Sequence, residues 1–385
     1  MAGIYIHIPF CRQACNYCNF HFSTSLRYKN ELLAALLKEM ELFPAAFPGE
    51  MTGATIETIY IGGGTPSLLS TDELQLVLGK VRTVFKVDPA AELTLETNPD
   101  DITGDRLVEW KSIGINRLSI GVQSFFEEDL RWMNRAHNAV QAESALRLAR
   151  SHFDNITMDL IYGTPGLTHE KWKANVDKAI ALGIPHLSCY ALTVEPNTPL
   201  QKMISQQKLQ DVDADVQSAQ FILLMKWLEE ADFEHYEISN FARPGFRSRH
   251  NSSYWQGKSY FGFGPSAHSF NGSERWWNIA NNSKYIASIN EGLIPFEKEV
   301  LTPVQRFNEF VMISLRTGEG LDLLRFRKNE WGFLPDKLAA LDTAMTLLAT
   351  EYAAKGLIHF TPEKIVLTKE GRLLADGIAA DFFTE

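Results

Sequence analysis

The sequence predicts an α/β protein, a partial (β/α)6 barrel followed by a small α+β domain of the winged-helix type. Short runs of β-branched and aliphatic residues alternate with amphipathic helical segments up to about residue 191. Such alternation is typical of parallel βαβ units. After Thr198-Pro199 the alternation stops, and the end of the chain combines short helices with two strands joined by a turn, which predicts the second domain.

Six runs predict the strands of the barrel: Ile4–Ile8, Ile56–Ile61, Glu92–Thr97, Arg117–Ile120, Ile156–Ile161 and His186–Ala191. Between them, apolar residues recur at helical spacing in Tyr28–Leu42, Thr71–Phe85, Arg106–Ile113, Ala142–Ser151 and Lys171–Ala181. Six such units are fewer than a complete TIM barrel has, so we expect a partial barrel of the TIM type. Its functional residues should lie at the C-terminal ends of the strands.

The changes of pattern divide the chain into three parts. Residues 1–230 form the expected barrel, which ends with a long amphipathic helix over Asp213–Glu230. Residues 231–300 are rich in glycine and aromatic residues and are expected to connect the barrel to the last domain. Residues 301–385 form that domain, with strands at Leu357–Phe360 and Lys364–Leu367. A structural cap is favoured over DNA binding because the domain lacks a basic recognition stripe.

Composition restricts the possible partners. Hydrophobic residues make up 45% of the 385 residues and charged residues 22%, as in a globular protein. The 37 basic residues are outnumbered by 47 acidic ones, and a net charge of −10 argues against nucleic-acid binding. No apolar run is long enough to cross a bilayer, and the N-terminal residues do not resemble a signal peptide. We therefore expect a cytoplasmic protein without a membrane anchor.

Three of the four cysteines are clustered as Cys11-x-x-x-Cys15-x-x-Cys18, just after the first predicted strand. Clustered cysteines in a large intracellular protein favour a metal site over a disulfide. Three thiolates holding an iron–sulfur cluster would leave one iron without a protein ligand. The alternative is a zinc site whose fourth ligand is His7 or His21, or simply reduced structural cysteines.

Polar residues follow the later strands in the same way. A Gly62-Gly63-Gly64-Thr65-Pro66 turn follows the second strand, where glycines allow backbone amides to approach a ligand. Glu96 ends the third strand, where its carboxylate is able to accept hydrogen bonds from the hydroxyl groups of a ribose. Gln123 ends the fourth strand. Arg135 is expected on the following helix, and Asp159 lies inside the apolar fifth strand. These two side chains would form a buried pair or bind a ligand.

The cysteine spacing resembles that of the radical-SAM superfamily. The resemblance implies that Cys11, Cys15 and Cys18 bind a [4Fe–4S] cluster whose open iron chelates S-adenosylmethionine. The glycine turn likewise resembles the motif of that superfamily that binds the amino group of S-adenosylmethionine. The sequence has Thr65 where many relatives have an acidic residue.

Within this superfamily, five motifs resemble those of the oxygen-independent coproporphyrinogen III dehydrogenase family: Tyr5–Cys11, Gly62–Pro66, Glu96–Pro99, Gly121–Phe125 and Met158–Gly163. The resemblance implies that one S-adenosylmethionine contacts Tyr5, Tyr17, Gly63, Gly64, Thr65 and Glu96. It implies that a second one contacts Gln123, Arg135, Asp159 and Ala191.

Three features match the HemW branch of this family, whose members are haem chaperones. Phe20 stands where the dehydrogenase has a further cysteine, and the chain lacks the extension upstream of the cluster. The segment His250-Asn-x-x-Tyr254-Trp255 resembles the haem-binding motif of the branch. The resemblance implies that His250 ligates haem iron while the two aromatic rings contact the porphyrin. A histidine that is only hydrogen-bonded within a packed loop is the alternative, and His268 is a less favoured second ligand.

The leading hypothesis is a haem-binding chaperone that delivers haem to membrane haemoproteins. The main alternative is a dehydrogenase that converts two propionates of coproporphyrinogen III to vinyl groups by radical decarboxylation. A third is a radical-SAM enzyme with an unrelated substrate. The expected partners are haem, a recipient haemoprotein and an electron donor, and a homodimer remains open.

Overall fold

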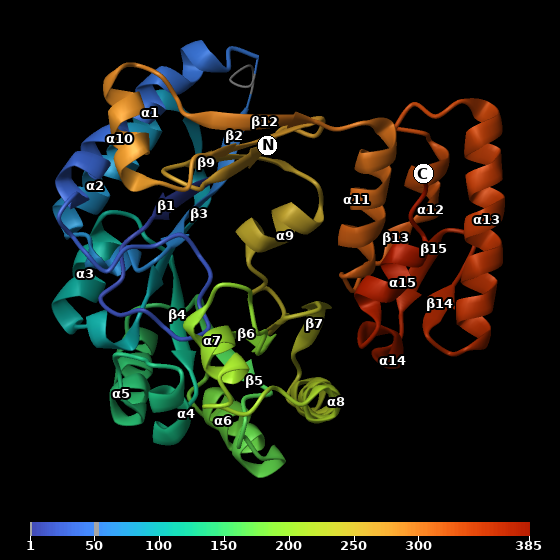
Figure 1. Ribbon diagram of the computed structural model, residues 1–385, viewed down its shortest axis with the longest axis horizontal. Helices are drawn as coiled ribbons and strands as arrows, with labels where there is room; N and C mark the ends of the chain where they lie inside the picture. The colour runs from blue at the N-terminus through green and yellow to red at the C-terminus, as the bar shows by residue number, and fades with distance from the viewer. Residues whose placement is uncertain (1, 50–53) are drawn as a thin grey trace.

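A computed structural model describes residues 2–49 and 54–385 of the protein. Six parallel strands form the centre of its main sheet and are hydrogen-bonded in chain order (Figure 1). They are β1 (Ala2–Ile8), β2 (Thr55–Gly63), β3 (Lys86–Thr97), β4 (Arg117–Gln123), β5 (Ile156–Tyr162) and β6 (His186–Ala191). The prediction of a partial barrel of six parallel strands is therefore confirmed, although several strands extend beyond their predicted ends.

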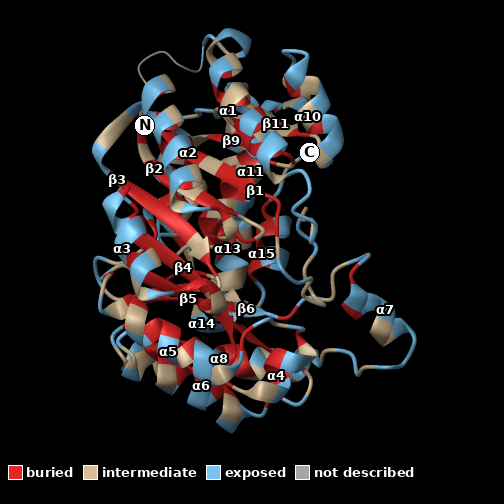
Figure 2. Cartoon of the chain, turned by 90° about the vertical axis from the view of Figure 1, so that its left-hand side faces the viewer, coloured by how far each residue is buried: buried red, intermediate tan, exposed pale blue. Residues whose placement is uncertain are grey.

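The helices that follow these strands cover the outer face of the sheet. They are α1 (Lys29–Ala46), α2 (Thr71–Val84), α3 (Gly104–Ser112), α4 (Glu127–Trp132), α5 (Ala139–Arg150) and α6 (His169–Ala181). Figure 2 shows the central strands buried between layers whose outer faces are exposed. Local sequence fixes where helices begin: Ser70 and Glu73 form a capping box at the start of α2, which satisfies backbone amides that would otherwise lack partners.

Residues 231–300 do more than connect two domains, because their strands extend the main sheet at both edges. Beyond β6 lie β8 (Asn240–Ala242) and β7 (Glu234–Glu237), which follow the long helix α8 (Ala214–Glu230). Beyond β1 lie β9 (Ser259–Phe263), β10 (His268–Phe270), β11 (Glu274–Asn278) and β12 (Phe296–Val300). The remaining helices of this half are α7 (Pro199–Ser205), α9 (Arg249–Trp255) and α10 (Asn282–Asn290). Strand β9 pairs with β1 in parallel, so the edge beside β1 is covered.

The C-terminal domain has its own hydrophobic core and its own sheet, in the order β13-β15-β14. Its elements are α11 (Pro303–Leu315), β13 (Leu321–Asp322), α12 (Leu323–Arg327), α13 (Pro335–Ala354), β14 (Ile358–Phe360), β15 (Lys364–Leu367), α14 (Lys369–Arg372) and α15 (Ala375–Asp381). The predicted hairpin is thus β14 and β15, while β13 was not predicted. Within the described ranges, the helices lack the combination of length and apolar character that crossing a bilayer requires.

Candidate functional site

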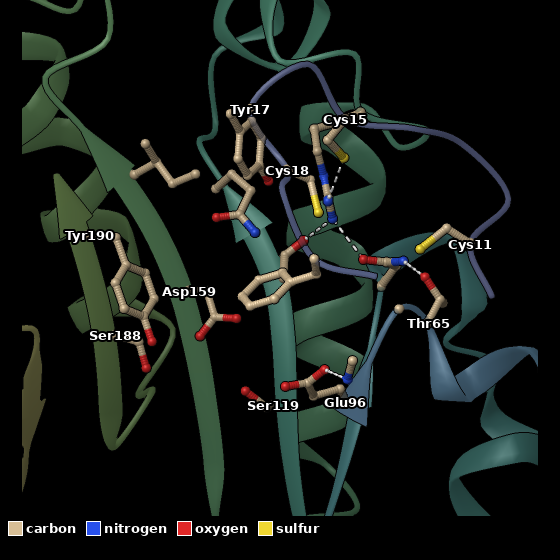
Figure 3. A pocket seen from close by; sticks show the side chains of 18 of the residues that line it. Cys11, Cys15, Tyr17, Cys18, Thr65, Glu96, Ser119, Asp159, Ser188 and Tyr190 are labelled. Atoms are coloured by element: carbon tan, nitrogen blue, oxygen red, sulfur yellow. Dashed lines mark hydrogen bonds between the residues drawn. The ribbon is translucent and has the colours of Figure 1, made fainter. Parts of the chain in front are cut away.

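A cavity of about 470 Å³ opens at the C-terminal ends of the parallel strands. Cys11, Cys15 and Cys18 line it from the loop after β1. Figure 3 shows Cys15 and Cys18 beside Tyr17, with Cys11 near Thr65. We call this space the cysteine cavity. Its position is the one that the barrel architecture predicts for functional residues.

The three thiols are unoxidised and share an electrostatic environment with one arginine. Arg135 donates a hydrogen bond from Nη1 to Sγ of Cys15 at 3.3 Å. Burial raises the pKa of Cys11 to about 11, against the lowering effect of a hydrogen bond with Thr65. Burial likewise raises the pKa of Cys18. A bound metal cluster would replace these protons, since only the thiolate is a metal ligand.

The geometry gives no support to the alternative of a zinc site. Among the described residues, no group of three or more His, Cys, Asp or Glu side chains is arranged to hold a single metal ion. His7 has both ring nitrogens hydrogen-bonded, to the Tyr5 hydroxyl at 3.0 Å and to the His21 carbonyl at 2.8 Å. The Nε2 atom of His21 contacts Asn282 at 2.7 Å. Both histidines that would complete a zinc site are thus engaged in other contacts.

Two carboxyl groups lie deeper in the cysteine cavity. Glu96 accepts hydrogen bonds from the Tyr60 hydroxyl at 2.7 Å and from the Gly63 amide at 3.0 Å. Asp159 lies opposite Ser188 in the register of β5 and β6. Burial raises the pKa of both groups, and with the nearby charge of Glu96 it raises the pKa of Asp159 to about 7. Both carboxyl groups are therefore placed to accept hydrogen bonds from a polar or cationic ligand.

The glycine turn is shaped by close packing of β2 against β1. The Gly64 amide donates to the Ile8 carbonyl at 2.9 Å, and a Cβ atom at this position would lie 2.6 Å from the Phe10 carbonyl oxygen. Gly63 has a φ of +107°. The amides of Gly63 and Gly64 thus donate to protein acceptors, whereas the Thr65 side chain faces the cavity and accepts a hydrogen bond from Asn98 at 3.1 Å.

Gln123 has two features that are typical of a ligand-binding residue. Its backbone has a φ of +73°, in the left-handed region, at a register shift between β4 and β5. In the part of the chain that the structure describes, its side-chain amide has no hydrogen-bond partner although it lines the cavity. Residues in such conformations cluster at functional sites.

Arg135 differs from its predicted position and contacts. It lies in the segment between α4 and α5, so its placement on a helix was wrong. It does not pair with Asp159. Its Nη2 atom donates to Asn98 at 2.7 Å and to the Gly121 carbonyl at 2.6 Å, and these acceptors hold the guanidinium beside Cys15.

The remaining predicted residues are divided between two cavities. Tyr17 and Ala191 line the cysteine cavity, whereas Tyr5 faces a second cavity. Side chains that were not predicted also line the cysteine cavity, among them Asn98, Ser119, Ser188 and Tyr190. Three of these lie in strands, where every second residue faces the same side. Polar residues spaced two apart, such as Ser188 and Tyr190, are the signal that would have found them.

His250 is enclosed in the protein, where α9 packs on β2. The residue is 1% exposed and lines neither of the two cavities. Nδ1 lies 2.8 Å from Oγ1 of Thr58, and Nε2 lies 2.8 Å from the hydroxyl of Tyr254. Its backbone amide donates to the buried carboxylate of Glu92 at 3.0 Å. Burial lowers the pKa of His250 to about 3, so the ring is neutral.

The second cavity, of about 850 Å³, lies between the barrel and the C-terminal domain. Tyr254 and Trp255 of α9 line it, together with residues of β10, β11, α11 and α12. We call it the interdomain cavity. Asn19 and Phe20 line both cavities, and Phe20 is 67% exposed, so this residue stands at the boundary between them.

Comparison with known proteins places the chain in a family. Residues 5–179 match the radical SAM superfamily and residues 301–374 the HemN C-terminal domain. The chain is 36% identical to the heme chaperone HemW of Mycobacterium tuberculosis, covering 98% of this chain and 93% of that protein. It is 33% identical to the heme chaperone HemW of Bacillus subtilis, covering 100% of both.

A solved structure agrees with this assignment at the level of the fold. The coproporphyrinogen III oxidase HemN of Escherichia coli, described as a radical SAM enzyme, superimposes with a TM-score of 0.84 at 25% identity. The match covers 100% of this chain and 90% of HemN. The sequence is more similar to the heme chaperones than to HemN, and this chain therefore belongs to the HemW family of heme chaperones, on a radical-SAM fold.

Proposed function

We propose that this protein is a haem chaperone, which binds haem in the cytoplasm and passes it to membrane haemoproteins. The proposal is supported by similarity to two heme chaperones. The match covers 93% of the protein from Mycobacterium tuberculosis and 100% of the protein from Bacillus subtilis. Phe20 supports the chaperone over the dehydrogenase, in which we expect a cysteine at this position.

The barrel would hold a [4Fe–4S] cluster through Cys11, Cys15 and Cys18, with S-adenosylmethionine on the open iron. Such a cluster supplies one electron to the bound cofactor. Arg135 remains charged and holds the Cys15 sulfur in place. Glu96 and Asp159 offer carboxylate oxygens and Gln123 offers a free amide, so the cavity matches a cofactor that has hydroxyl, amino and sulfonium groups.

A pair of cysteine variants tests the cluster assignment. Cys18→Ala removes one of the three thiols of the cavity, whereas Cys189→Ala removes a thiol buried in β6. After anaerobic reconstitution, we expect the iron content and visible absorbance of a [4Fe–4S] cluster in the wild type and in Cys189→Ala only. A full cluster in Cys18→Ala would contradict the assignment.

The chaperone and the dehydrogenase predict different results for the reconstituted protein. In a haem titration monitored by the Soret absorbance, the chaperone should bind one haem per protein. It should form no protoporphyrinogen IX from coproporphyrinogen III with S-adenosylmethionine and a reductant. Formation of that product by repeated turnover would favour the dehydrogenase and overturn the proposal.

A further inference from the structure

The interdomain cavity combines chemical groups that a porphyrin would match. Three histidines of the barrel line it, together with three arginines, two of which belong to the C-terminal domain. Aromatic rings also line it, including Tyr254, Trp255, Phe310 and Trp331. Its volume of about 850 Å³ falls within the range of cofactor sites, about 300–1,000 Å³. These groups match haem, which combines an iron ion, a flat apolar ring and two carboxylates.

His268 is the histidine of this cavity that is free to bind a metal. It is exposed on β10 and stacks on Trp277 of β11, with 5.8 Å between the ring centroids. Among the described residues, neither of its ring nitrogens has a hydrogen-bond partner. Burial and the nearby Arg275 lower its pKa, which keeps the imidazole neutral. A neutral imidazole is the form that ligates haem iron.

Arg306 is the cation best placed to receive a propionate. Arg275 pairs with Glu309 at 2.6 Å, and Arg325 pairs with Glu330 at 2.8 Å. Arg306 has no carboxylate partner in the described ranges, its buried Nε atom lacks a hydrogen bond, and its Nη2 atom donates only to the Trp331 carbonyl. A buried guanidinium nitrogen without an acceptor is costly unless a ligand supplies one.

We propose that haem binds in the interdomain cavity, with its iron on His268 and a propionate on Arg306. This inference rests on the proposed chaperone function and adds the site to it. The bond is a coordinate bond from a ring nitrogen to iron, so no oxidant or reductant is needed. The cavity is open between two domains, which suits a ligand that must leave again.

His250 then acts as a positioning residue. Its Nε2 contact fixes the Tyr254 hydroxyl, and its Nδ1 contact with Thr58 ties α9 to β2. The motif of residues 250–255 would therefore support haem binding through the wall that Tyr254 and Trp255 form, without a bond from His250 to iron.

Haem titration of the full-length protein tests the site. We expect His268→Ala to weaken binding at least about tenfold and to abolish the axial-histidine spectrum, which added imidazole should restore. Arg306→Gln should weaken binding about three- to tenfold and leave that spectrum unchanged. His250→Gln should weaken binding but also keep the spectrum. His169→Ala and Arg131→Gln, at exposed positions outside both cavities, are the matched controls and should bind like the wild type.

The results of the titration distinguish a wrong haem site from a wrong function. If the wild type binds one haem while His268→Ala keeps the wild-type affinity and spectrum, the site is wrong and the chaperone function stands. Loss of the axial spectrum in His250→Gln or His21→Ala instead would also overturn the assignment of His268. If the wild type binds no haem, the proposed function and the site fail together.

Discussion

At Gln123 the chain adopts a backbone conformation that glycine would accept more readily. A non-glycine residue in a disfavoured region costs roughly 1–3 kcal/mol, and the φ of +73° at the end of β4 places Gln123 there. Its amide makes no hydrogen bond within the described structure. In the free protein, no hydrogen bond of the Gln123 side chain offsets this strain. We infer that the amide forms its hydrogen bond with a ligand.

We predict that Gln123→Gly raises the free energy of unfolding by about 1 kcal/mol and weakens S-adenosylmethionine binding. Urea denaturation and equilibrium dialysis would measure the two effects. The matched control is Gln207→Gly, because Gln207 has a φ of +57° but is exposed and lies outside the cysteine cavity. It should gain stability without changing cofactor binding. Unchanged binding in Gln123→Gly would remove Gln123 from the site.

Asp159 should make the binding of S-adenosylmethionine in the cysteine cavity depend on pH. Burial and the charge of Glu96 raise its pKa to about 7, so its carboxylate forms only as the pH rises through that value. The ionised form interacts more strongly with the cationic cofactor. Affinity for S-adenosylmethionine should therefore increase from about pH 6 to about pH 8. Asp159→Asn should flatten this dependence, and an unchanged slope in that variant would show that another group titrates.

Among the elements, α1 is tied to the edge of the sheet through a buried carboxyl group. Glu39 accepts hydrogen bonds from Tyr285 at 2.6 Å, from the Gly264 amide at 2.8 Å and from Asn278 at 2.5 Å. No cation is among these partners, and burial raises the pKa of Glu39 to about 7. These contacts hold the turn that precedes β10, the strand that carries His268.

Glu39 should make the stability of the protein depend on pH. Because its pKa is higher in the folded state, its contribution is complete below the unfolded value of 4.5 and is lost as the pH rises to about 7. The loss should approach about 3 kcal/mol, measured by urea denaturation from pH 4.5 to 7.5. Glu39→Gln should reduce this slope by that amount and leave the contribution of Asp159, whose pKa is raised in the same way, whereas Glu41→Gln, at an exposed position of α1, should retain the full slope. An unchanged slope in Glu39→Gln would contradict the assignment.

The sequence was sufficient for the six parallel strands because their signals are local: apolar runs between amphipathic helices. It was insufficient for strands β7–β12, which are short and pair with partners far along the chain, such as β9 with β1. The metal site at Cys11, Cys15 and Cys18 could be predicted because these cysteines are close together in the sequence. The contacts of Arg135 with Asn98 and Gly121 arise only when the ends of β3 and β4 lie side by side. The enclosure of His250 likewise depends on the packing of α9 against β2, which a motif does not reveal.

At the scale of the whole molecule, the two domains are joined by contacts that leave the interdomain cavity open. Arg247 pairs with Glu319 at 2.6 Å, and the Gly318 amide donates to the Tyr236 carbonyl at 2.9 Å. In Figure 1, β12 leads from the barrel directly into α11, which lines the cavity. Haem in this cavity would bridge both domains.

Haem binding should therefore slow amide hydrogen exchange on both walls, in β10 and β11 of the barrel and in α11 and α12 of the C-terminal domain. The outer helices α3 and α5 should be unaffected. Hydrogen exchange with mass spectrometry, comparing the free and haem-bound protein, would measure this pattern. Protection confined to α9 and β2 would instead place haem beside His250.

In the proposed function, haem is a cargo and not a permanently held group. The most direct test is to load the protein with one haem and mix it with vesicles that contain a membrane cytochrome stripped of its haem. We expect the Soret spectrum of the chaperone to disappear as that of the cytochrome forms, with one haem transferred per protein. Retention of haem by the protein while the cytochrome remains empty would contradict it.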